Sequence, residues 1–226
     1  MRLKVYIHLQ MMYCAIQKVI MFRNKYCQKI WDFIGIPFRL VLFDQSWLPM
    51  FGWTTLEDER INRVLTHIQG RLLDIGAGNN KLVKTYKNGT GVDIYNWDES
   101  TLIVKNTASL PFRSQSFDTI TFLACLNHIP NRVDVISESA RLLKPNGKII
   151  ITMINPILGG IGHTVWWYGE DRHRGGMQKG EVGGLWKNDI ISILKINDLQ
   201  LIQHERFVYG LNNLYIFKRF GQCIYQ

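Results

Sequence analysis

Apolar positions along the chain switch between the spacing of a helix and the continuous run of a buried strand. After Thr54 and Thr55, two residues that can cap a helix, apolar residues recur at intervals of three and four up to Gly70. The stretch 72–75 is then apolar except for Asp74, as in a strand that is buried on both faces. The pattern predicts a helix that leads into an interior strand.

The same alternation continues through most of the chain and predicts an α/β fold. Further elements are strands at 91–94, 102–104, 117–123 and 148–154, helices through about 82–86 and 132–143, and a turn at 145–147. Parallel strands need a connection that travels back along the sheet, usually as a helix. We therefore expect a Rossmann-like, doubly wound and mostly parallel sheet with helices on both faces. The stretches 199–208 and 214–218, separated by a turn at 210–213, predict an antiparallel hairpin at one edge.

The composition is that of one globular domain. Of the 226 residues, 46% are hydrophobic and 20% are charged, which leaves enough apolar surface for a core and excludes disordered, collagen-like and coiled-coil chains. The four cysteines have no paired spacing, so we expect neither a zinc ribbon nor a disulfide framework, and no metal. Such cysteines are typical of a reducing compartment, which predicts a cytoplasmic protein.

Positive charge is concentrated at the start of the chain. The net charge is +9, and residues 1–50 contribute +5 of it, because they hold seven basic and two acidic residues. The apolar run at 5–22 is interrupted by polar residues and is too short for a membrane span. We expect residues 1–53 to form a basic helical extension and residues 54–226 to form the folded domain. Two interpretations stay open: weak contact of residues 1–30 with an anionic membrane surface, or an ordinary packing helix.

The residues best suited to bind a ligand lie at the end of the strand at 72–75. There Asp74 is followed by a turn of Gly76, Ala77 and Gly78, in which glycine lets the backbone approach a ligand closely. Asp93 ends the next strand, where a carboxylate can accept hydrogen bonds from both hydroxyls of a ribose. The two acids and the turn together predict a nucleoside-binding site.

The charge at this turn helps to select the nucleoside cofactor. A dinucleotide needs a third glycine for close packing around its pyrophosphate, and the chain has Lys81 at that position. No P-loop lysine motif follows the turn. Asp74 would repel a pyrophosphate, but it would attract a ligand that carries an ammonium and a sulfonium, as S-adenosylmethionine does. The pattern therefore favours S-adenosylmethionine over NAD or FAD.

Together, these motifs resemble those of class I S-adenosylmethionine-dependent methyltransferases, and in particular the type 11-like small bacterial group. The resemblance rests on the segments 74–78, 108–112, 117–118 and 142–147 and on Asp93. It is plain over about residues 70–155, and further similarities extend it to about 30–220. The cofactor-binding residues that it implies are Asp74, Gly76, Ala77, Gly78, Asp93, Ile94, Asn106, Thr107, Ala108 and Leu123.

Two positions differ from the pattern of this family. Asn80 stands where the family has a third glycine, and Asn106 stands where an acid often contacts the adenine amino group. Asparagine tolerates left-handed backbone geometry better than most residues, and the carbonyl of Asn106 or the backbone of Thr107 and Ala108 can still meet adenine. We expect the two changes to affect the affinity for the cofactor rather than its identity.

The family places the segment 124–130 beside the reacting methyl group, which makes His128 the candidate general base. A histidine can accept a proton from a hydroxyl or an amine near neutral pH. The alternative is that His128 caps the following helix or packs on the cofactor. The segment lacks the Asp/Asn-Pro-Pro-Tyr/Phe motif of enzymes that methylate nucleic-acid amino groups, so nucleic acid is disfavoured as a substrate.

The stretch 156–186 is unusual because it holds nine of the 19 glycines together with aromatic and charged residues. Glycines can act as hinges and aromatic side chains can exclude water, so we expect an active-site lid inserted into the domain. The alternative is a surface loop whose tryptophans pack on the sheet. The candidate substrate contacts are Asn127, His163, Trp167, Tyr168, His173, Arg174 and Glu181.

The resemblance implies an enzyme that transfers a methyl group from S-adenosylmethionine to a small molecule or to a glycan or lipid precursor. In such a direct transfer, catalysis rests mainly on the positioning of donor and acceptor. Two other functions stay open: a cofactor-binding scaffold without turnover, and a nicotinamide-dependent oxidoreductase. The residues name neither the acceptor nor the oligomeric state.

Overall fold

A twisted seven-stranded sheet forms the centre of the protein. The computed structural model describes residues 30–31, 33–36, 45–164 and 176–219. The strands are β1 (Leu72–Ile75), β2 (Gly89–Asp93), β3 (Leu102–Ile103), β4 (Phe117–Leu123), β5 (Leu143–Ile154), β6 (Leu199–Phe207) and β7 (Asn212–Arg219). They lie in the order β3-β2-β1-β4-β5-β7-β6. β1 to β5 pair in parallel, and β6 and β7 add an antiparallel edge, which confirms the predicted fold class.

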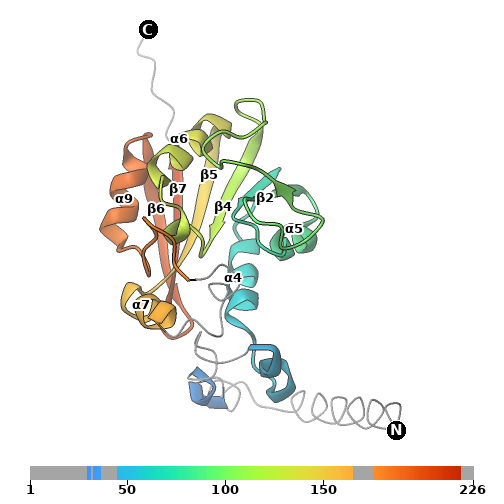
Figure 1. The fold of residues 1–226 in the computed structure, drawn as a ribbon, viewed down its shortest axis with the longest axis vertical. Helices are drawn as coiled ribbons and strands as arrows, with labels where there is room; N and C mark the ends of the chain where they lie inside the picture. Colours follow the sequence, from blue (N-terminus) through green and yellow to red (C-terminus); the bar gives the residue numbers. More distant parts are fainter. Residues whose placement is uncertain (1–29, 32, 37–44, 165–175, 220–226) are drawn as a thin grey trace.

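Helices cover both faces of the sheet (Figure 1). They are η1 (Gln45–Phe51), α4 (Leu56–Leu65), α5 (Lys81–Tyr86), η2 (Leu126–His128), α6 (Arg132–Leu142), α7 (Pro156–Thr164) and α9 (Lys187–Lys195). Successive side chains of a strand point to opposite faces. Leu72 of β1 therefore joins a core with α4 and α5, whereas Leu73 and Ile75 join a second core with α6 and α9.

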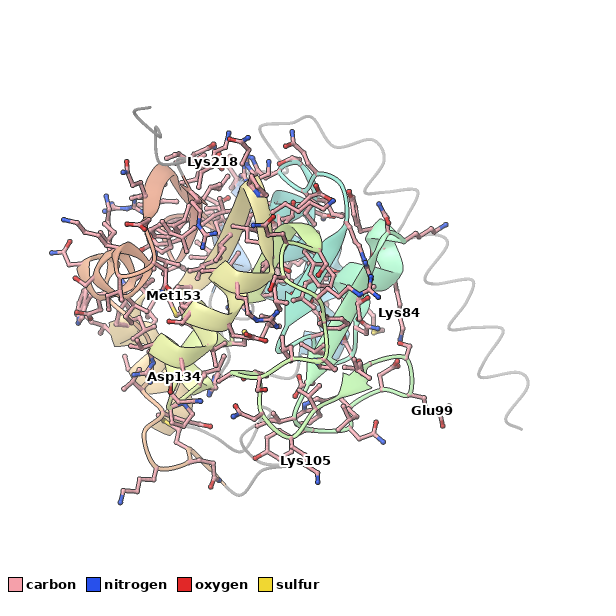
Figure 2. All side chains as sticks on the ribbon, turned by 90° about the horizontal axis from the view of Figure 1, so that it is seen from above. Lys84, Glu99, Lys105, Asp134, Met153 and Lys218 are labelled. Atoms are coloured by element: carbon pink, nitrogen blue, oxygen red, sulfur yellow. The ribbon has the colours of Figure 1, made fainter. Side chains whose placement is uncertain are left out.

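Most charged side chains lie outside these two cores, and Asp74 and Asp93 are buried exceptions at the ends of β1 and β2. Figure 2 labels five charged residues, Lys84, Glu99, Lys105, Asp134 and Lys218, around the margin of the molecule. Met153, at the end of β5, lies instead among the packed side chains and is buried. The fully buried strands explain why the sequence of the central sheet is almost continuously apolar.

The predicted start of the first well-marked helix is confirmed. Thr55 caps α4, because its hydroxyl accepts a hydrogen bond of 3.0 Å from the backbone N–H of Asp58. The helix ends at Leu65, and Gly70 takes the left-handed conformation (φ +60°) just before β1. A side chain at this glycine would collide with Asp118, which accepts a hydrogen bond from the next backbone N–H, that of Arg71.

Several strand boundaries differ from the prediction: β2 begins at Gly89 rather than at 91, and β5 and β7 also begin earlier than expected. β5 begins at Leu143 rather than at 148, because Leu143 already pairs with Phe117 of β4. The predicted turn therefore lies inside the strand, where Asn146 has a left-handed φ of 63° and the register shifts. At the edge hairpin, Asn212 and Asn213 belong to β7 rather than to the turn, because they pair with residues of β6.

The stretch 156–186, predicted as a lid, begins with a helix that the sequence analysis did not predict, and the lid itself stays a prediction. α7 follows β5 almost directly, and its glycines serve close packing of two backbones. A Cβ at Gly159 would lie 1.8 Å from the carbonyl oxygen of Gly183, and a Cβ at Gly183 would lie 2.7 Å from the Cα of Gly160. Glycines that let two backbones approach closely add nothing to the three- and four-residue spacing of apolar positions that indicates a helix. The sequence pattern therefore did not predict α7.

The beginning of the described chain lies beyond the carboxyl ends of the parallel strands. Figure 1 shows the segments 30–36 and 45–51, in blue, at the same end of the molecule as α7. The predicted membrane contact of residues 1–30 falls almost wholly outside the described residues, and the division at residue 53 stays a prediction. Within the described residues, no helix is long and apolar enough to cross a bilayer.

Candidate functional site

The glycine turn after β1 is held against the end of β2. The backbone N–H groups of Gly76 and Ala77 both donate to the carbonyl of Val92, over 2.9 and 3.1 Å. Gly78 donates its N–H to the carboxylate of Asp93 over 2.9 Å, and its carbonyl accepts a hydrogen bond of 3.1 Å from the hydroxyl of Thr101. These hydrogen bonds to Val92, Asp93 and Thr101 hold the backbone of the turn in one conformation without a ligand.

The two glycines of this turn are required for different reasons. Both have positive φ, +72° at Gly76 and +52° at Gly78, which is unfavourable for other residues. A Cβ at Gly76 would also lie 2.7 Å from the Cβ of Cys125, so this glycine lets the loop after β4 pack on the turn. A Cβ at Gly78 would meet nothing within 4 Å, so this position opens onto space beside Asp93.

Asn80 adopts the conformation of the glycine that it replaces. Its φ is 60°, as its tolerance of left-handed geometry suggested. The side chain is buried and donates hydrogen bonds to the backbone carbonyl and the hydroxyl of Ser100, over 2.9 and 3.1 Å. Its amide oxygen takes the place that a Cβ at Gly91 would need. The departure from the family pattern is therefore accommodated by a second glycine and a polar partner.

Asp93 presents its carboxylate at the end of β2. One oxygen accepts the N–H of Gly78, and the other accepts the N–H of Tyr95 over 2.9 Å. A carboxylate has about four acceptor positions, so each oxygen can still accept a hydroxyl of a ribose. Ile94 and Tyr95, which follow directly, are both exposed and offer apolar surface beside the acid. The arrangement fits a ribose with an attached flat base.

Asp74 is enclosed at the end of β1. It is 1% exposed, and burial raises the pKa of its carboxyl from 3.8 to about 7. A 2.6 Å hydrogen bond from the hydroxyl of Thr121 opposes this rise in pKa, and the negative charge of Asp93 adds to it. No cation contributes to the pKa of Asp74 in the part of the chain that is described. A positively charged ligand near this acid would offset both the cost of burying a negative charge and the repulsion between Asp74 and Asp93.

The segment that was expected to meet adenine has its own internal hydrogen bond. The side-chain oxygen of Asn106 accepts a hydrogen bond of 2.9 Å from the backbone N–H of Ala108. This bond closes a turn, and the N–H of Ala108 already has an acceptor. Thr107 between them is buried. Leu123, at the end of β4, is partly buried and packs against the core beneath α4 and α5. For the Asn106 amide, Thr107 and Leu123, contact with the cofactor stays a prediction.

The loop after β4 crosses directly over the glycine turn. Its first residue, Ala124, has a left-handed φ of 52°, and its N–H donates to the carbonyl of Thr152 in β5 over 3.0 Å. The thiol of Cys125 donates to the carbonyl of Ile75 over 2.9 Å. These contacts bring η2, with Asn127 and His128, to the carboxyl end of the sheet.

A segment from beyond α7 is bound to this loop. The side-chain amide of Asn127 donates to the carbonyl of Val182 over 3.1 Å, and the backbone carbonyl of Asn127 accepts the N–H of Val182 over 3.0 Å. Arg132 donates to the carbonyl of Gly180 over 2.8 Å. Asn127 therefore has a bridging role, and its predicted contact with substrate stays a prediction.

His128 and Glu181 form a pair within this interface. The distance between Nδ1 of His128 and Oε2 of Glu181 is 3.2 Å. The Glu181 side chain is 3% exposed, whereas the His128 side chain is 21% exposed. The structure thus brings together a predicted base and a predicted substrate contact that lie 53 residues apart in the sequence.

The other predicted site residues divide into two groups. His163 lies in α7, and its side chain is not described. Trp167, Tyr168, His173 and Arg174 lie outside the described residues, so their roles stay predictions. Sequence reasoning missed Thr121 and the partnership of His128 with Glu181, because neither has a local pattern. Among the described residues, no three histidine, cysteine, aspartate or glutamate side chains could together hold a metal ion.

Comparison with known proteins agrees with this geometry. Residues 73–151 match the family model described as a methyltransferase domain, and this segment contains the glycine turn, both acids and the loop after β4. Residues 73–151 thus form a methyltransferase domain. The predicted family is confirmed, and with it S-adenosylmethionine as the cofactor of this methyltransferase domain.

A solved structure supports the fold of the chain. It is the crystal structure of an S-adenosylmethionine-dependent methyltransferase, a possible histamine N-methyltransferase, from Thermotoga maritima. The TM-score is 0.57 at 13% identity, and the match covers 73% of this chain and 89% of that chain. At this level of identity, the similarity concerns the fold alone.

Curated relatives match parts of this chain. An uncharacterized protein of Methanocaldococcus jannaschii is 36% identical over 93 residues, which are 37% of this chain and 37% of that protein. The ubiquinone biosynthesis O-methyltransferase of Shewanella pealeana is 29% identical over 140 residues, which are 57% of this chain and 55% of that enzyme. The chain thus spans between about a third and about half of the length of these relatives.

Proposed function

We propose that this protein transfers the methyl group of S-adenosylmethionine to a small-molecule acceptor. The observation that carries the proposal is the pair of acids at the ends of β1 and β2, on either side of a rigid glycine turn. Asp93 fits the ribose hydroxyls, and the buried Asp74 fits a ligand with positive charge. When bound, S-adenosylmethionine supplies a methyl group activated by its positively charged sulfur.

The acceptor is proposed to be a small molecule or a glycan or lipid precursor. The Shewanella pealeana relative is named as an O-methyltransferase of ubiquinone biosynthesis, which agrees with an acceptor of this class. The loop after β4 also lacks the motif that enzymes acting on nucleic-acid amino groups carry at this place. Both points favour a small acceptor, and neither selects its reacting atom.

His128 is proposed as the general base for an acceptor that must lose a proton. In this proposal Glu181 is ionised and accepts a hydrogen bond from Nδ1 of the neutral ring across the contact of 3.2 Å. Nε2 is then the nitrogen that accepts the proton. Glu181 acts as a positioning residue, because it holds the ring in one orientation and stabilises the imidazolium that forms.

The cofactor is tested by isothermal titration calorimetry with S-adenosylmethionine, S-adenosylhomocysteine and NADH. We expect the two adenosyl ligands to bind and NADH not to bind. In Gly78→Ala, the added methyl group enters the open space beside Asp93, and we expect the affinity for S-adenosylhomocysteine to fall roughly tenfold or more.

Gly210→Ala is the matched control for this substitution. Gly210 also has positive φ, +82°, and a Cβ there also meets nothing within 4 Å, but it lies in the turn between β6 and β7. Both variants carry a similar backbone strain of about 1 kcal/mol. Equal effects of the two substitutions on affinity, or tight binding of NADH alone, would contradict the proposed site.

Activity is tested with a methyl-labelled donor and a fractionated small-molecule extract. We expect label in an extract component, and we expect His128→Ala to reduce the turnover of that component about 10²-fold or more while cofactor affinity changes little. Glu181→Gln should have a smaller effect and should move the acidic limb of the pH–rate profile to lower pH, because the imidazolium loses its partner.

The pair His67 and Glu205 provides the control. Their separation is 3.5 Å and the His67 side chain is 21% exposed, the same fraction as for His128, but they connect the segment after α4 with β6. His67→Ala should leave turnover unchanged. An equal loss of turnover in His67→Ala and His128→Ala would indicate a structural role for His128. Cofactor binding without label in any fraction would favour the silent scaffold.

A further inference from the structure

Asn127 fixes the backbone that follows Glu181. Its side-chain amide donates to the carbonyl of Val182 over 3.1 Å, and its backbone carbonyl accepts the N–H of the same residue over 3.0 Å. One residue thus satisfies both backbone polar groups of Val182. Asn127 is itself 2% exposed, and it directly precedes His128 in η2. The two hydrogen bonds therefore join the residue next to His128 with the residue next to Glu181.

Arg132 fixes the backbone that precedes Glu181. Its Nη2 donates to the carbonyl of Gly180 over 2.8 Å, from the first turn of α6, where Figure 2 labels Asp134. Gly180 has a left-handed φ of +91°, and a Cβ there would lie 2.9 Å from the Cβ of Pro130. A side chain at this position would push the two segments apart. Glu181 is therefore bound to one loop through the residue on each side of it.

The contact between His128 and Glu181 is too weak to create this arrangement by itself. Nδ1 and Oε2 are 3.2 Å apart, and the His128 side chain is 21% exposed. Ion pairs that reach solvent add little stability, because the charges are screened and two side chains must be ordered. The hydrogen bonds to the backbone of Gly180 and Val182 do not depend on this pair. They hold the chain so that only the side chain of Glu181, which is 3% exposed, remains to be ordered.

The bonding of Arg132 differs from that of a side chain that serves stability alone. Its Nε is buried and has no acceptor among the described residues. A buried donor without an acceptor lowers the stability of the fold. Such departures from full pairing are expected at functional sites, where position matters more than stability.

We propose that Asn127 and Arg132 are positioning residues for methyl transfer, which hold Glu181 against His128 by fixing the backbone on both sides of Glu181. The inference rests on the proposed function, in which Nε2 of His128 takes a proton from the acceptor. With Glu181 in place, the neutral ring keeps its own proton on Nδ1 and presents Nε2 as the acceptor of a proton. When either backbone contact is lost, Glu181 moves away, and the ring carries its proton on either nitrogen.

The first test is NMR spectroscopy of the full-length protein with isotope-labelled histidine, at a pH at which the ring of His128 is neutral. The signals of His128 are those that disappear in His128→Ala. We expect the proton on Nδ1 in the original protein and a mixture of both tautomers in Arg132→Met, in Asn127→Ala and in Glu181→Ala. Arg132→Lys keeps a donor for the carbonyl of Gly180 and should preserve the Nδ1–H form. The measurement requires neither cofactor nor acceptor, so it is independent of the proposed activity.

Arg219→Met is the matched control for Arg132→Met. Nη2 of Arg219 also donates to a backbone carbonyl of α6, that of Ala140 over 2.9 Å, but near the other end of the helix. The control should leave the proton of His128 on Nδ1. An unchanged tautomer in both Arg132→Met and Asn127→Ala would overturn the inference, and so would an equal change in Arg219→Met. Two variants from separate contacts keep the test decisive if one of them fails to fold.

The second test is turnover with the methyl-labelled donor and the extract component. We expect Arg132→Met and Asn127→Ala each to reduce turnover roughly tenfold at unchanged affinity for S-adenosylhomocysteine, and Arg132→Lys to recover most of it. In a Glu181→Ala background, Arg132→Met should cause no further loss, because no carboxylate is left to position. Unchanged turnover in His128→Ala would overturn the proposed base and this role with it. A loss in His128→Ala without one in Arg132→Met would overturn the positioning role alone.

Discussion

Replacement of Asp74 by asparagine is expected to stabilise the cofactor-free protein at alkaline pH and to weaken its binding of S-adenosylmethionine. The carboxyl has a pKa of about 7 in the folded protein and 3.8 in its ordinary environment. Between these values, the unfolded chain has lost the proton and the folded chain has kept it. The free energy of unfolding therefore falls as pH rises through this window, by on the order of 4 kcal/mol at most. Asparagine has no proton to lose and can still accept the Thr121 hydrogen bond.

The measurement is urea denaturation of both proteins at several pH values without cofactor. We expect similar stability at about pH 4 and a more stable Asp74→Asn variant above about pH 7. Asp118→Asn is the control of opposite sign, because the contact of Asp118 with Lys144 lowers the pKa of that carboxyl. Asp118 contributes stability above its ordinary pKa, so its replacement should destabilise the protein at neutral pH. Parallel stability curves for Asp74→Asn and the original protein would contradict the burial of an ionisable acid.

The Asp74→Asn variant also distinguishes an effect on folding stability from an effect on cofactor binding. A positively charged ligand near Asp74 favours the ionised carboxyl, so binding should release a proton and the affinity should increase as pH rises toward about 7. Calorimetry in two buffers with different heats of ionisation measures this proton. In Asp74→Asn, we expect weaker binding and no proton release. A gain in stability together with unchanged affinity would place the positive charge of the ligand elsewhere.

Asp93→Ala is expected to reduce cofactor affinity by about tenfold to a hundredfold. Loss of a charge-assisted hydrogen bond costs roughly 1.5 to 3 kcal/mol, and Asp93 is the acid that fits the ribose hydroxyls. The substitution also leaves the N–H groups of Gly78 and Tyr95 without their acceptor, so the turn should become less stable. Calorimetry with S-adenosylhomocysteine, well below the unfolding temperature of the variant, measures the effect on binding.

Asp98→Ala is the control for this loss of charge. Asp98 lies close in sequence and pairs with Lys84 on the surface, which helps to hold the pKa of its carboxyl at about 2. Its replacement removes the same charge without touching the turn, and we expect little change in affinity. If Asp98→Ala weakened binding as much as Asp93→Ala, the effect would be one of overall charge rather than of a ribose contact.

The fold and the cofactor end of the site follow from local pattern. Buried parallel strands leave continuous apolar runs, and the helices between them leave intervals of three and four, so both can be recognised from neighbours in the sequence. The turn at Gly76 and Gly78 is also local, since its backbone conformation requires glycine. Asn80 was correctly expected to take left-handed geometry, because that preference belongs to the residue itself.

Errors arose where a residue serves a distant contact. The glycines of α7 were interpreted as hinges, but Gly159 allows the backbone at Gly183 to approach. The start of β5 was placed too late, because Leu143 belongs to the strand only through its pairing with Phe117. In both cases, the deciding partner lies more than 20 residues away in the sequence, and no periodic pattern records it.

The sequence by itself determined the succession of the strands along the chain, the helices other than α7 that lie between them, the glycine turn and the two acids, since each depends on the conformational preference or burial of a short stretch of chain. Only the tertiary structure decided that Thr121 donates to Asp74 and that Glu181 lies against His128. Such pairings depend on how strands are ordered and where loops cross them, and the close packing of the whole domain fixes both.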